Sequence, residues 1–332
     1  MTTEILLLPQ LKALDLYHNQ LRGSIPVEYS GKFSSLELQH NLLTGSLPPE
    51  IFEANSLDFL NVGENVLSGS ISASIGQATS LSSLYLFGNI FVGSLPQELA
   101  SLPLTAFRAN RNFLEGTVPF DKVGAWAGSL EELWLSDNSF SGTISSRIGN
   151  FLGLRDLRMS RNKLVGSIPL EMYDLAQLRT LHVDDNGIDG SLSPMVVLFS
   201  RIEDLNLKNN SMDGTIPESF YELLNLRTLN FEGNRFSGTL SSRLGQLLDL
   251  EEFNISNNLF VGQIPMELAR LSNLQSLELS FNQFSGDITI QACDTLDLGV
   301  LRADCLPIES PPQQCSCCTH CCDRETLGCR EL

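Results

Sequence analysis

The fold is decided by a short pattern that is clearest in residues 271–286, LSNLQSLELSFNQFSG. Leu274, Leu277 and Leu279 precede Asn282, and Gly286 follows four residues after the asparagine. The L-x-L part alternates apolar and polar residues, as a half-buried β-strand does. One strand of this length cannot bury its apolar face alone, so the pattern predicts stacking against copies of itself.

The same pattern recurs along nearly the whole chain. Its asparagine returns at intervals of 22 to 26 residues, with a glycine four residues later and Ile, Leu or Val six residues later; seven repeats add a proline directly after that aliphatic residue. Stacked copies predict a parallel sheet of about 12 strands, roughly 53 Å long at a spacing of ~4.8 Å. The marker residues are Asn19, Asn41, Asn65, Asn89, Asn112, Asn138, Asn162, Asn186, Asn210, Asn234, Asn258 and Asn282.

Each consensus residue has an expected physical role. The asparagine, buried where the chain leaves the strand, should bond backbone groups of its own coil and the next, since an unpaired buried amide costs ~1–3 kcal/mol. The glycine permits a backbone conformation that a side chain forbids, and the proline stiffens the extended stretch that follows. The bulky residue two positions after the asparagine is expected to pack in the core and not to bind a ligand, at Leu21, Phe91, Phe140, Phe236, Phe260 and Phe284.

The unit LxxLxLxxNxLxGxIPxxLxxL resembles the plant-type leucine-rich-repeat family, over roughly residues 4–290. The resemblance implies an α/β-type solenoid that is mostly β and irregular, a curved right-handed superhelix. It also implies a concave parallel sheet that binds peptides, proteins or small ligands. The motif specifies the fold and hardly constrains the ligand.

The two ends of the chain differ from the repeats. Glu4, Ile5, Leu8 and Leu11 align with the interior of a repeat, so the chain begins without a cap and we expect a fragment of a longer protein, whose signal or anchor would lie outside it. A wrongly placed start or a partner covering the edge are the alternatives. Two domains are predicted, a solenoid over 1–290 and a cysteine-rich cap over 291–332.

All eight cysteines lie in that last segment, which resembles the C-terminal cap of leucine-rich-repeat proteins in diatoms and related algae. An even number in a tight cluster predicts disulfides and an oxidising compartment, with the pairing left open among 105 possibilities. A zinc or copper(I) cluster is the alternative, but the cap position and a single nearby histidine, His320, favour disulfides, so no metal is predicted. The cysteines are Cys293, Cys305, Cys315, Cys317, Cys318, Cys321, Cys322 and Cys329.

Composition and motifs exclude several function classes. The net charge of −18 without a Lys/Arg cluster argues against partners such as nucleic acid or an anionic membrane surface. No apolar run is long enough to insert into a membrane. Phosphate-loop, zinc-protease, hydrolase and kinase motifs are missing, and His18, His40, His182 and His320 are far apart. The chain is therefore expected to have no catalytic activity and no cofactor.

The candidate ligand site lies on solvent-facing strand positions of the middle repeats. Tyr, Trp and Arg dominate binding hot spots, and Arg beside Trp allows cation–π contact. Four arginines in an acidic chain should form a basic island suited to an acidic peptide, a carboxylate or a sulfated glycan. The alternative is that Arg and Trp only cover one another. The column is Tyr85, Arg108, Trp134, Arg158 and His182, flanked by Phe87, Arg111, Arg161, Asp184 and Asp185.

Two glycosylation sequons begin at Asn209 and Asn254, although so many Asn and Ser residues produce such sequons by chance. A run of asparagines at 206, 230 and 254 is interpreted as a solvated amide ladder. A glycan on Asn254 would block the C-terminal third of the concave face and leave the region from Tyr85 to Asp185 open.

Three functions remain open. The first is a receptor-like or secreted recognition ectodomain that binds a protein or peptide through its concave face. The second is a structural or adhesive protein of a cell surface or wall, and the third is the ectodomain of a receptor kinase whose kinase lies outside this chain. All three place the chain outside the cell or at its surface, with the oligomeric state open. The full-length gene would separate them.

Overall fold

A computed structural model describes residues 8, 10–29, 33–53, 55–122, 124–285, 296, 298–304, 318–323 and 328–331. The chain divides into two compact units, Met1–Val165 and Gly166–Leu332. Each unit is built of successive coils that contribute one strand to each of two sheets, with a short helical turn between them.

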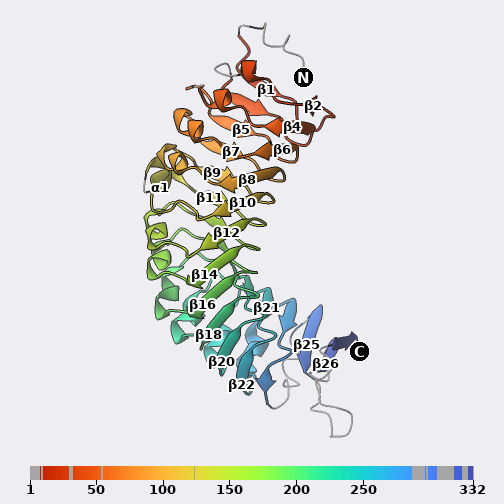
Figure 1. Ribbon diagram of the computed structural model, residues 1–332. Coiled ribbons are helices and arrows are strands. Elements are labelled where there is room, and N and C mark those ends of the chain that lie inside the picture. The colour runs from red at the N-terminus through yellow and green to blue at the C-terminus, as the bar shows by residue number, and fades with distance from the viewer. Residues whose placement is uncertain are drawn as a thin grey trace. The chain divides into compact units, whose positions relative to one another are not determined.

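The first sheet of the first unit is parallel, with strands in chain order (Figure 1). Its register places equivalent residues side by side, for example Leu36 beside Leu60 and Leu60 beside Leu84. These leucines point inward and are fully buried. The predicted parallel stacking is confirmed in strands β1 (Ala13–Asp15), β3 (Ser35–Glu37), β5 (Phe59–Asn61), β7 (Ser83–Tyr85), β9 (Ala106–Arg108), β11 (Glu132–Trp134) and β13 (Asp156–Arg158).

A second parallel sheet, which the sequence pattern did not predict, forms from the segment that follows each asparagine. Inward side chains such as Leu67 and Phe91 are fully buried while their neighbours Val66 and Ile90 are exposed, so these strands also alternate. In this unit the strands are β2 (Arg22–Gly23), β4 (Leu42–Ser46), β6 (Val66–Gly69), β8 (Ile90–Ser94), β10 (Phe113–Gly116), β12 (Ser139–Gly142) and the first residues of β14 (Lys163–Ser167).

Short helical turns close each coil. Pro96 ends an extended stretch at the N-cap of one, and Ser72 and Ser145 cap two others by accepting a hydrogen bond from a backbone N–H. Proline thus fixes the entry into the turn as well as the extended stretch. The turns are η2 (Val27–Tyr29), η3 (Pro49–Glu53), η4 (Ala73–Gln77), η5 (Gln97–Ser101), α1 (Ala125–Ser129) and η6 (Ser146–Asn150).

The second unit repeats this plan. Its first sheet comprises β15 (Thr180–His182), β17 (Asp204–Asn206), β19 (Thr228–Asn230), β21 (Glu252–Asn254), β23 (Ser276–Glu278), β25 (Val300–Asp304), β26 (His320–Asp323) and the antiparallel β27 (Gly328–Glu331). Its second sheet comprises β16 (Gly187–Ser191), β18 (Ser211–Gly214), β20 (Arg235–Gly238), β22 (Leu259–Gly262) and β24 (Gln283–Phe284). The turns are η7 (Leu170–Asp174), η8 (Pro194–Leu198), η9 (Glu218–Glu222), η10 (Ser242–Gln246) and η11 (Met266–Arg270). The mostly β solenoid is confirmed.

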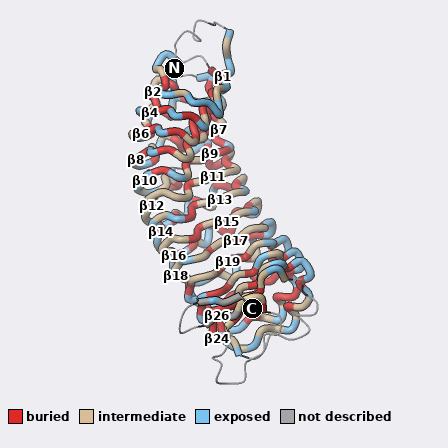
Figure 2. The backbone as a smooth tube through the Cα atoms, turned by 90° about the vertical axis from the view of Figure 1, so that its right-hand side faces the viewer, coloured by how far each residue is buried: buried red, intermediate tan, exposed pale blue. Residues whose placement is uncertain are grey.

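The core of each unit runs between its two sheets, as the buried residues along the coils show (Figure 2). The bulky residue after each asparagine lies in this core: Phe236 and Phe260 are fully buried, with ring centroids 6.4 Å apart. These side chains therefore hold adjacent coils together and are not a ligand stripe.

The consensus asparagines form the expected ladder, with one correction. Asn89 is 5% exposed and donates to the carbonyls of Leu86 and Phe87 in its own coil. It also donates to the carbonyl of Val62 and accepts from the N–H of Leu67, both in the preceding coil. The prediction that it bonds the next coil was wrong, because the next coil's own asparagine occupies the corresponding groups of this coil.

The last repeat is closed by Asp304 on β25. Its carboxylate accepts hydrogen bonds from the backbone N–H groups of Phe281, at 2.6 Å, and Asn282, at 3.1 Å. In the preceding coil the equivalent N–H groups donate to carbonyls of the coil that follows. The aspartate therefore supplies the acceptors that backbone carbonyls of the following coil supply elsewhere.

Part of the predicted disulfide framework is described. Cys322 on β26 is bonded to Cys329 on β27, and Cys318 is also disulfide-bonded. Cys293, Cys305, Cys315 and Cys317 lie outside the described residues, and nothing is described of the Cys321 side chain. The boundary between solenoid and cap near residue 290 also lies outside them and stays a prediction.

Candidate functional site

The first-sheet face of the first unit brings four of the predicted column residues together. Tyr85, Arg108, Trp134 and Arg158 stand at equivalent positions of β7, β9, β11 and β13. The Arg108 guanidinium carbon lies 3.9 Å from the Trp134 ring centroid and 4.8 Å from that of Tyr85. The Arg158 guanidinium carbon lies 4.8 Å from the Trp134 ring centroid. We call this alternating stack the aromatic–guanidinium ladder.

Each arginine of this region also has an acidic partner. Arg108 contacts Glu132 at 2.6 Å and Arg158 contacts Asp156 at 2.8 Å, in the neighbouring column of the same sheet. The expected basic island is therefore neutralised locally. The two flanking arginines are paired in the same way, Arg111 with Glu64 and Arg161 with Asp137, each at 2.6 Å.

The side chains of the ladder cover one another and are therefore half-buried. Trp134 Nε1 is buried and has no hydrogen-bond partner among the described residues, and the same holds for Oδ1 of Asn110, which lies two residues after β9. A buried polar atom without a partner is costly in a structural surface. The arrangement thus combines mutual cover, the alternative considered above, with polar capacity that the fold leaves unused.

Two further aromatic rings extend the ladder towards β5. Phe59 packs edge-on against Tyr85 with ring centroids 5.3 Å apart. Phe87 lies over Gly63, where an added Cβ would come within 2.5 Å of its ring. The glycine therefore makes room for the ring. The ladder and these two rings form one continuous surface on the first unit.

The remaining predicted residues belong to the second unit. His182 Nε2 lies 2.7 Å from the carboxylate of Asp204 on β17. Asp184 is buried, at 8% exposure. Asp185 accepts a hydrogen bond from the amide of Asn209 at 2.8 Å. In their own unit, His182 and Asp185 are thus engaged in contacts with the neighbouring coil.

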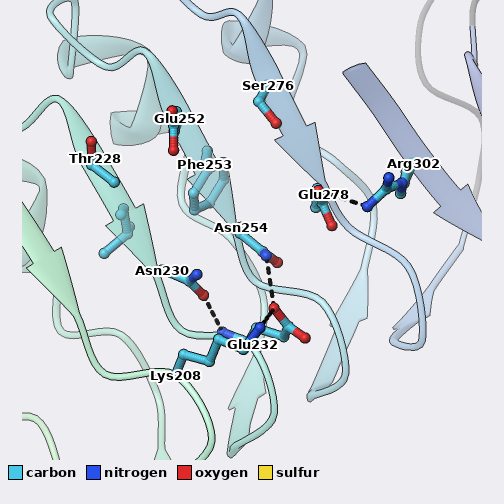
Figure 3. Close-up of a pocket in the computed structure, with 11 residues that line it drawn as sticks. Lys208, Thr228, Asn230, Glu232, Glu252, Phe253, Asn254, Ser276, Glu278 and Arg302 are labelled. Atoms are coloured by element: carbon cyan, nitrogen blue, oxygen red, sulfur yellow. Dashed lines mark hydrogen bonds and ion pairs between the residues drawn. The ribbon is translucent and has the colours of Figure 1, made fainter. Parts of the chain in front are cut away.

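The second unit contains a pocket of about 390 Å³ on its first-sheet face, which the sequence did not predict (Figure 3). Glu232 accepts from Lys208 at 2.8 Å and from the Asn254 amide at 3.1 Å, and Arg302 donates to Glu278 at 3.0 Å. The pocket is lined by Lys208, Thr228, Leu229, Asn230, Glu232, Glu252, Phe253, Asn254, Ser276, Glu278 and Arg302.

One row of this pocket has hydrogen-bonding capacity to spare. Thr228, Glu252 and Ser276 stand side by side on β19, β21 and β23, and their side chains have no hydrogen bond or ion pair within the described residues. Threonine, glutamate and serine on a strand are typical of solvated surface, so residue type alone gives no signal. The regular register of the column, which the repeat predicts, is the signal that could have grouped them.

The asparagine run was only partly a solvated ladder. Asn254 accepts from the N–H and the hydroxyl of Ser256 and donates to Glu232, so its amide is held inside the pocket. The other sequon residue, Asn209, is more open and has a left-handed backbone with φ of 50°. Glycosylation at either position stays a prediction, with Asn209 the more accessible.

The expectation that the histidines lie far apart was wrong for one pair, because His18 and His40 stand on successive coils and their rings stack with centroids 4.1 Å apart. No metal-binding group of three or more His, Cys, Asp or Glu side chains occurs among the described residues. In that same part of the chain, every helix falls short of the length and apolarity required to span a bilayer.

Comparisons with known proteins agree with this architecture. The family model described as Leucine Rich Repeat matches residues 10–31, 129–151, 201–223, 225–247 and 249–271. A comparison with curated proteins gives no significant match.

Among solved structures, PEPR1 in complex with AtPEP1 is similar at a TM-score of 0.82 and 31% identity, covering 89% of this chain and 42% of that one. The Arabidopsis receptor kinase HAESA, in complex with the peptide hormone IDA and the co-receptor SERK1, is similar at 0.77 and 30%, covering 98% and 64%. A plant ice-binding protein is similar at 0.55 and 25%, covering 74% and 71%.

The chain thus spans only 42% to 64% of the receptor chains it resembles. Its repeats, its two parallel sheets and these neighbours agree with one another. The chain is a leucine-rich-repeat protein with a mostly β solenoid fold, similar to the ectodomains of plant receptors.

Proposed function

We propose that this chain is a non-catalytic recognition module that binds a protein or peptide through the first-sheet face of its first unit. The observation that carries the proposal is the aromatic–guanidinium ladder, in which Arg108 lies 3.9 Å from the Trp134 ring. Trp, Tyr and Arg are the residue types that dominate binding hot spots, and here their side chains are already fixed in position.

The comparisons support a recognition role outside the cell. The similar structures of PEPR1 and HAESA contain AtPEP1 and the peptide hormone IDA respectively, and HAESA is a receptor kinase. By analogy, we propose that this chain is part of a secreted or receptor-like ectodomain with a peptide or protein partner. A kinase or an anchor elsewhere in the full protein would agree with that proposal.

The ion pairs of the ladder determine which ligand groups can bind without displacing a residue of the protein. An acidic ligand group must displace Glu132 from Arg108 or Asp156 from Arg158, so it exchanges one charge-assisted contact for another. Apolar contact with the Trp134 ring needs no such exchange. We therefore propose that an aromatic or aliphatic side chain on Trp134 supplies most of the affinity, and that a carboxylate at the arginines supplies specificity.

The experiment is a selection of binders from a display library of random peptides. For an enriched peptide, Trp134→Ala should weaken binding by about 30-fold or more, which corresponds to the ~2 kcal/mol of a hot spot. The matched control is Tyr17→Ala, an exposed aromatic two residues after β1 of the same sheet and away from the ladder. Equal losses from the two variants would reject the ladder as the site.

A second candidate function is adhesion to a solid surface, a specific form of the structural or adhesive function that the sequence left open. The observation that favours it is the outer side of the second sheet of the first unit, where the large apolar side chains of Val66, Ile90, Val92 and Phe113 are exposed. The similar plant ice-binding protein suggests ice as the solid. This function would use a different face of the same unit, so it competes with peptide recognition for none of its residues.

A further inference from the structure

One acidic side chain on the first-sheet face of the second unit has no partner, although the protein neutralises its counterparts. The first residue of the first-sheet strands β1 to β23 is acidic in four cases, and Glu252 on β21 is one of them. Glu252 is exposed and makes no hydrogen bond or ion pair within the described residues (Figure 3). The other three each contact a basic side chain: Glu132 contacts Arg108 at 2.6 Å, Asp156 contacts Arg158 at 2.8 Å and Asp204 contacts His182 at 2.7 Å.

Amide side chains stand where the basic partners stand elsewhere. Relative to Glu252, Asn230 on β19 has the position in the preceding strand that Arg108 has relative to its acid. Asn254 has the position in the same strand that Arg158 has relative to its acid. An amide carries no charge, so Glu252 is left without the counter-charge that this face supplies to its other acids.

The other charges of the pocket around Glu252 are balanced. Lys208 lies 2.8 Å from Glu232, and Arg302 lies 3.0 Å from Glu278. The lining of this pocket of about 390 Å³ therefore carries one uncompensated negative charge, located at Glu252. A lone exposed glutamate is ordinary on a protein surface, whereas a pocket whose remaining charges are paired favours a cationic ligand group over an anionic one.

Two hydroxyl groups flank the carboxylate and distinguish between basic ligand groups. Thr228 on β19 and Ser276 on β23 stand on either side of Glu252, and both hydroxyls lack a hydrogen bond within the described residues. Their backbones are about 10 Å apart at ~4.8 Å per strand. An ammonium donates from one nitrogen, so two acceptors that share it lie at most about 6 Å apart. A guanidinium donates from both ends of a plane and reaches about 2 Å further, so it can approach the carboxylate and both hydroxyls once these rotate inwards.

The amide of Asn230 offers a hydrogen-bond donor beside this cluster. Its oxygen accepts a hydrogen bond from the N–H of Glu232 at 3.0 Å, and its nitrogen donates to no group within the described residues. Such a nitrogen can donate to a backbone carbonyl of a ligand, a group that every peptide carries. An anionic centre with a neutral donor nearby thus fits an arginine side chain that belongs to a peptide or protein.

We propose that the pocket around Glu252 binds the guanidinium group of an arginine side chain on a peptide or protein partner. The carboxylate of Glu252 accepts two N–H bonds, in the bidentate arrangement that guanidinium and carboxylate groups prefer. Thr228 and Ser276 accept from the remaining N–H groups, and Asn230 donates to the partner's backbone. The proposal goes beyond the recognition function of the first unit, because none of these residues belongs to the aromatic–guanidinium ladder.

The test titrates the whole chain with the blocked tripeptide acetyl-Gly-Arg-Gly-amide at low salt and follows binding by NMR. The same peptide with lysine in place of arginine should bind about fivefold more weakly, since an ammonium loses one hydroxyl contact. With citrulline, which has the shape of arginine and no charge, binding should be at least tenfold weaker. The proposal is overturned if the arginine peptide does not bind, or if either of the other peptides binds as tightly.

Glu252→Gln should lower the affinity for the arginine peptide about tenfold, because the contact is no longer between opposite charges. The matched control is Glu251→Gln, which makes the same change in charge one residue earlier, at an acid that pairs with Arg227 at 3.3 Å. This control should keep wild-type affinity. Equal losses in the two variants would mean that the peptide responds only to net negative charge, and the proposed site would be wrong.

Asn230→Arg supplies the missing cation from within the chain. The new guanidinium takes the position that Arg108 has relative to its acid and should pair with Glu252, so the arginine peptide should bind at least tenfold more weakly. Thermal denaturation verifies that each variant is folded. Unchanged affinity in folded Asn230→Arg would show that the peptide binds elsewhere and would contradict the proposal. None of these outcomes bears on the Trp134 test of the first unit, so the two proposals fail separately.

Discussion

At the scale of single residues, each buried asparagine links two coils through one amide group. The Asn89 amide donates to three backbone carbonyls and accepts from one backbone N–H, and the equivalent asparagines repeat these bonds from coil to coil. The sequence predicted the burial and the bonding, because an amide in an apolar repeat must be paired. It did not predict the direction of the ladder, which depends on how the side chain is oriented in the folded coil.

Asn89→Ala should lower the free energy of unfolding by roughly 3 kcal/mol, since it leaves the buried N–H of Leu67 without a partner and removes one of the donors to each of the carbonyls of Val62, Leu86 and Phe87. The measurement is urea denaturation. Asn19→Ala is the control, because Asn19 is exposed and donates only to carbonyls of its own coil. Its loss should stay below about 1 kcal/mol. Similar losses at both positions would mean that burial of the asparagines contributes little to stability.

A buried tyrosine gives the fold a predictable sensitivity to alkali. Burial raises the pKa of Tyr221 to about 12, although its hydroxyl accepts a hydrogen bond from the N–H of Ser241 at 3.3 Å. The neutral form is favoured in the folded state, so this stability is complete below the ordinary tyrosine pKa of about 10 and is lost as the pH rises towards 12.

Between pH 10 and pH 12, the free energy of unfolding should therefore fall less steeply with pH in Tyr221→Phe than in wild type. The difference in this loss should reach ~2–3 kcal/mol at the upper end. Unfolding by urea at several pH values gives the comparison, and tyrosinate absorbance in the folded protein reports the titration directly. An unchanged pH dependence in Tyr221→Phe would show that another group controls alkaline unfolding.

At the scale of elements, the repeat predicted the first sheet and missed the second. The L-x-L pattern marks β7 or β11 by alternation, and the register follows from the repeat itself. The segment after each asparagine, such as Ile90–Ser94, contains a glycine with positive φ, which the sequence explains only as a backbone conformation that a side chain forbids. Its strand pairing depends on the neighbouring coil, so it is visible only once the coils are stacked.

The glycine column separates backbone strain from close packing. Gly93 and Gly142 have φ of 78° and 81°, so alanine is strained at both. An added Cβ would be 3.7 Å from Ser70 at Gly93 but 3.0 Å from Thr117 at Gly142. Gly142→Ala should therefore lose about 1 kcal/mol more stability than Gly93→Ala, whose loss of ~1–2 kcal/mol reflects strain alone. Thermal denaturation of the two variants measures the difference, and a larger loss for Gly93→Ala would contradict it.

At the scale of the whole molecule, recognition and adhesion are assigned to different faces of one unit. The sequence could place Tyr85, Arg108 and Trp134 in one column, because repeat register fixes which residues are neighbours. It could not show that Glu132 and Asp156 neutralise the arginines, since those partners stand in another column. The sequence did not predict the pocket around Glu252 for a related reason. Its unpaired polar groups are of residue types common on protein surfaces, and only the folded structure shows that they lack partners.

The most direct test of the recognition proposal is hydroxyl-radical footprinting of the protein with and without a peptide selected from the display library. Trp134 and Tyr85 should become protected from oxidation when the peptide is bound, because it covers the ladder. Tyr17, which is 47% exposed and lies two residues after β1, outside the ladder, should react at the same rate in both states. Unchanged oxidation of Trp134 and Tyr85 in the bound state, with protection confined to other surfaces, would contradict the proposed site.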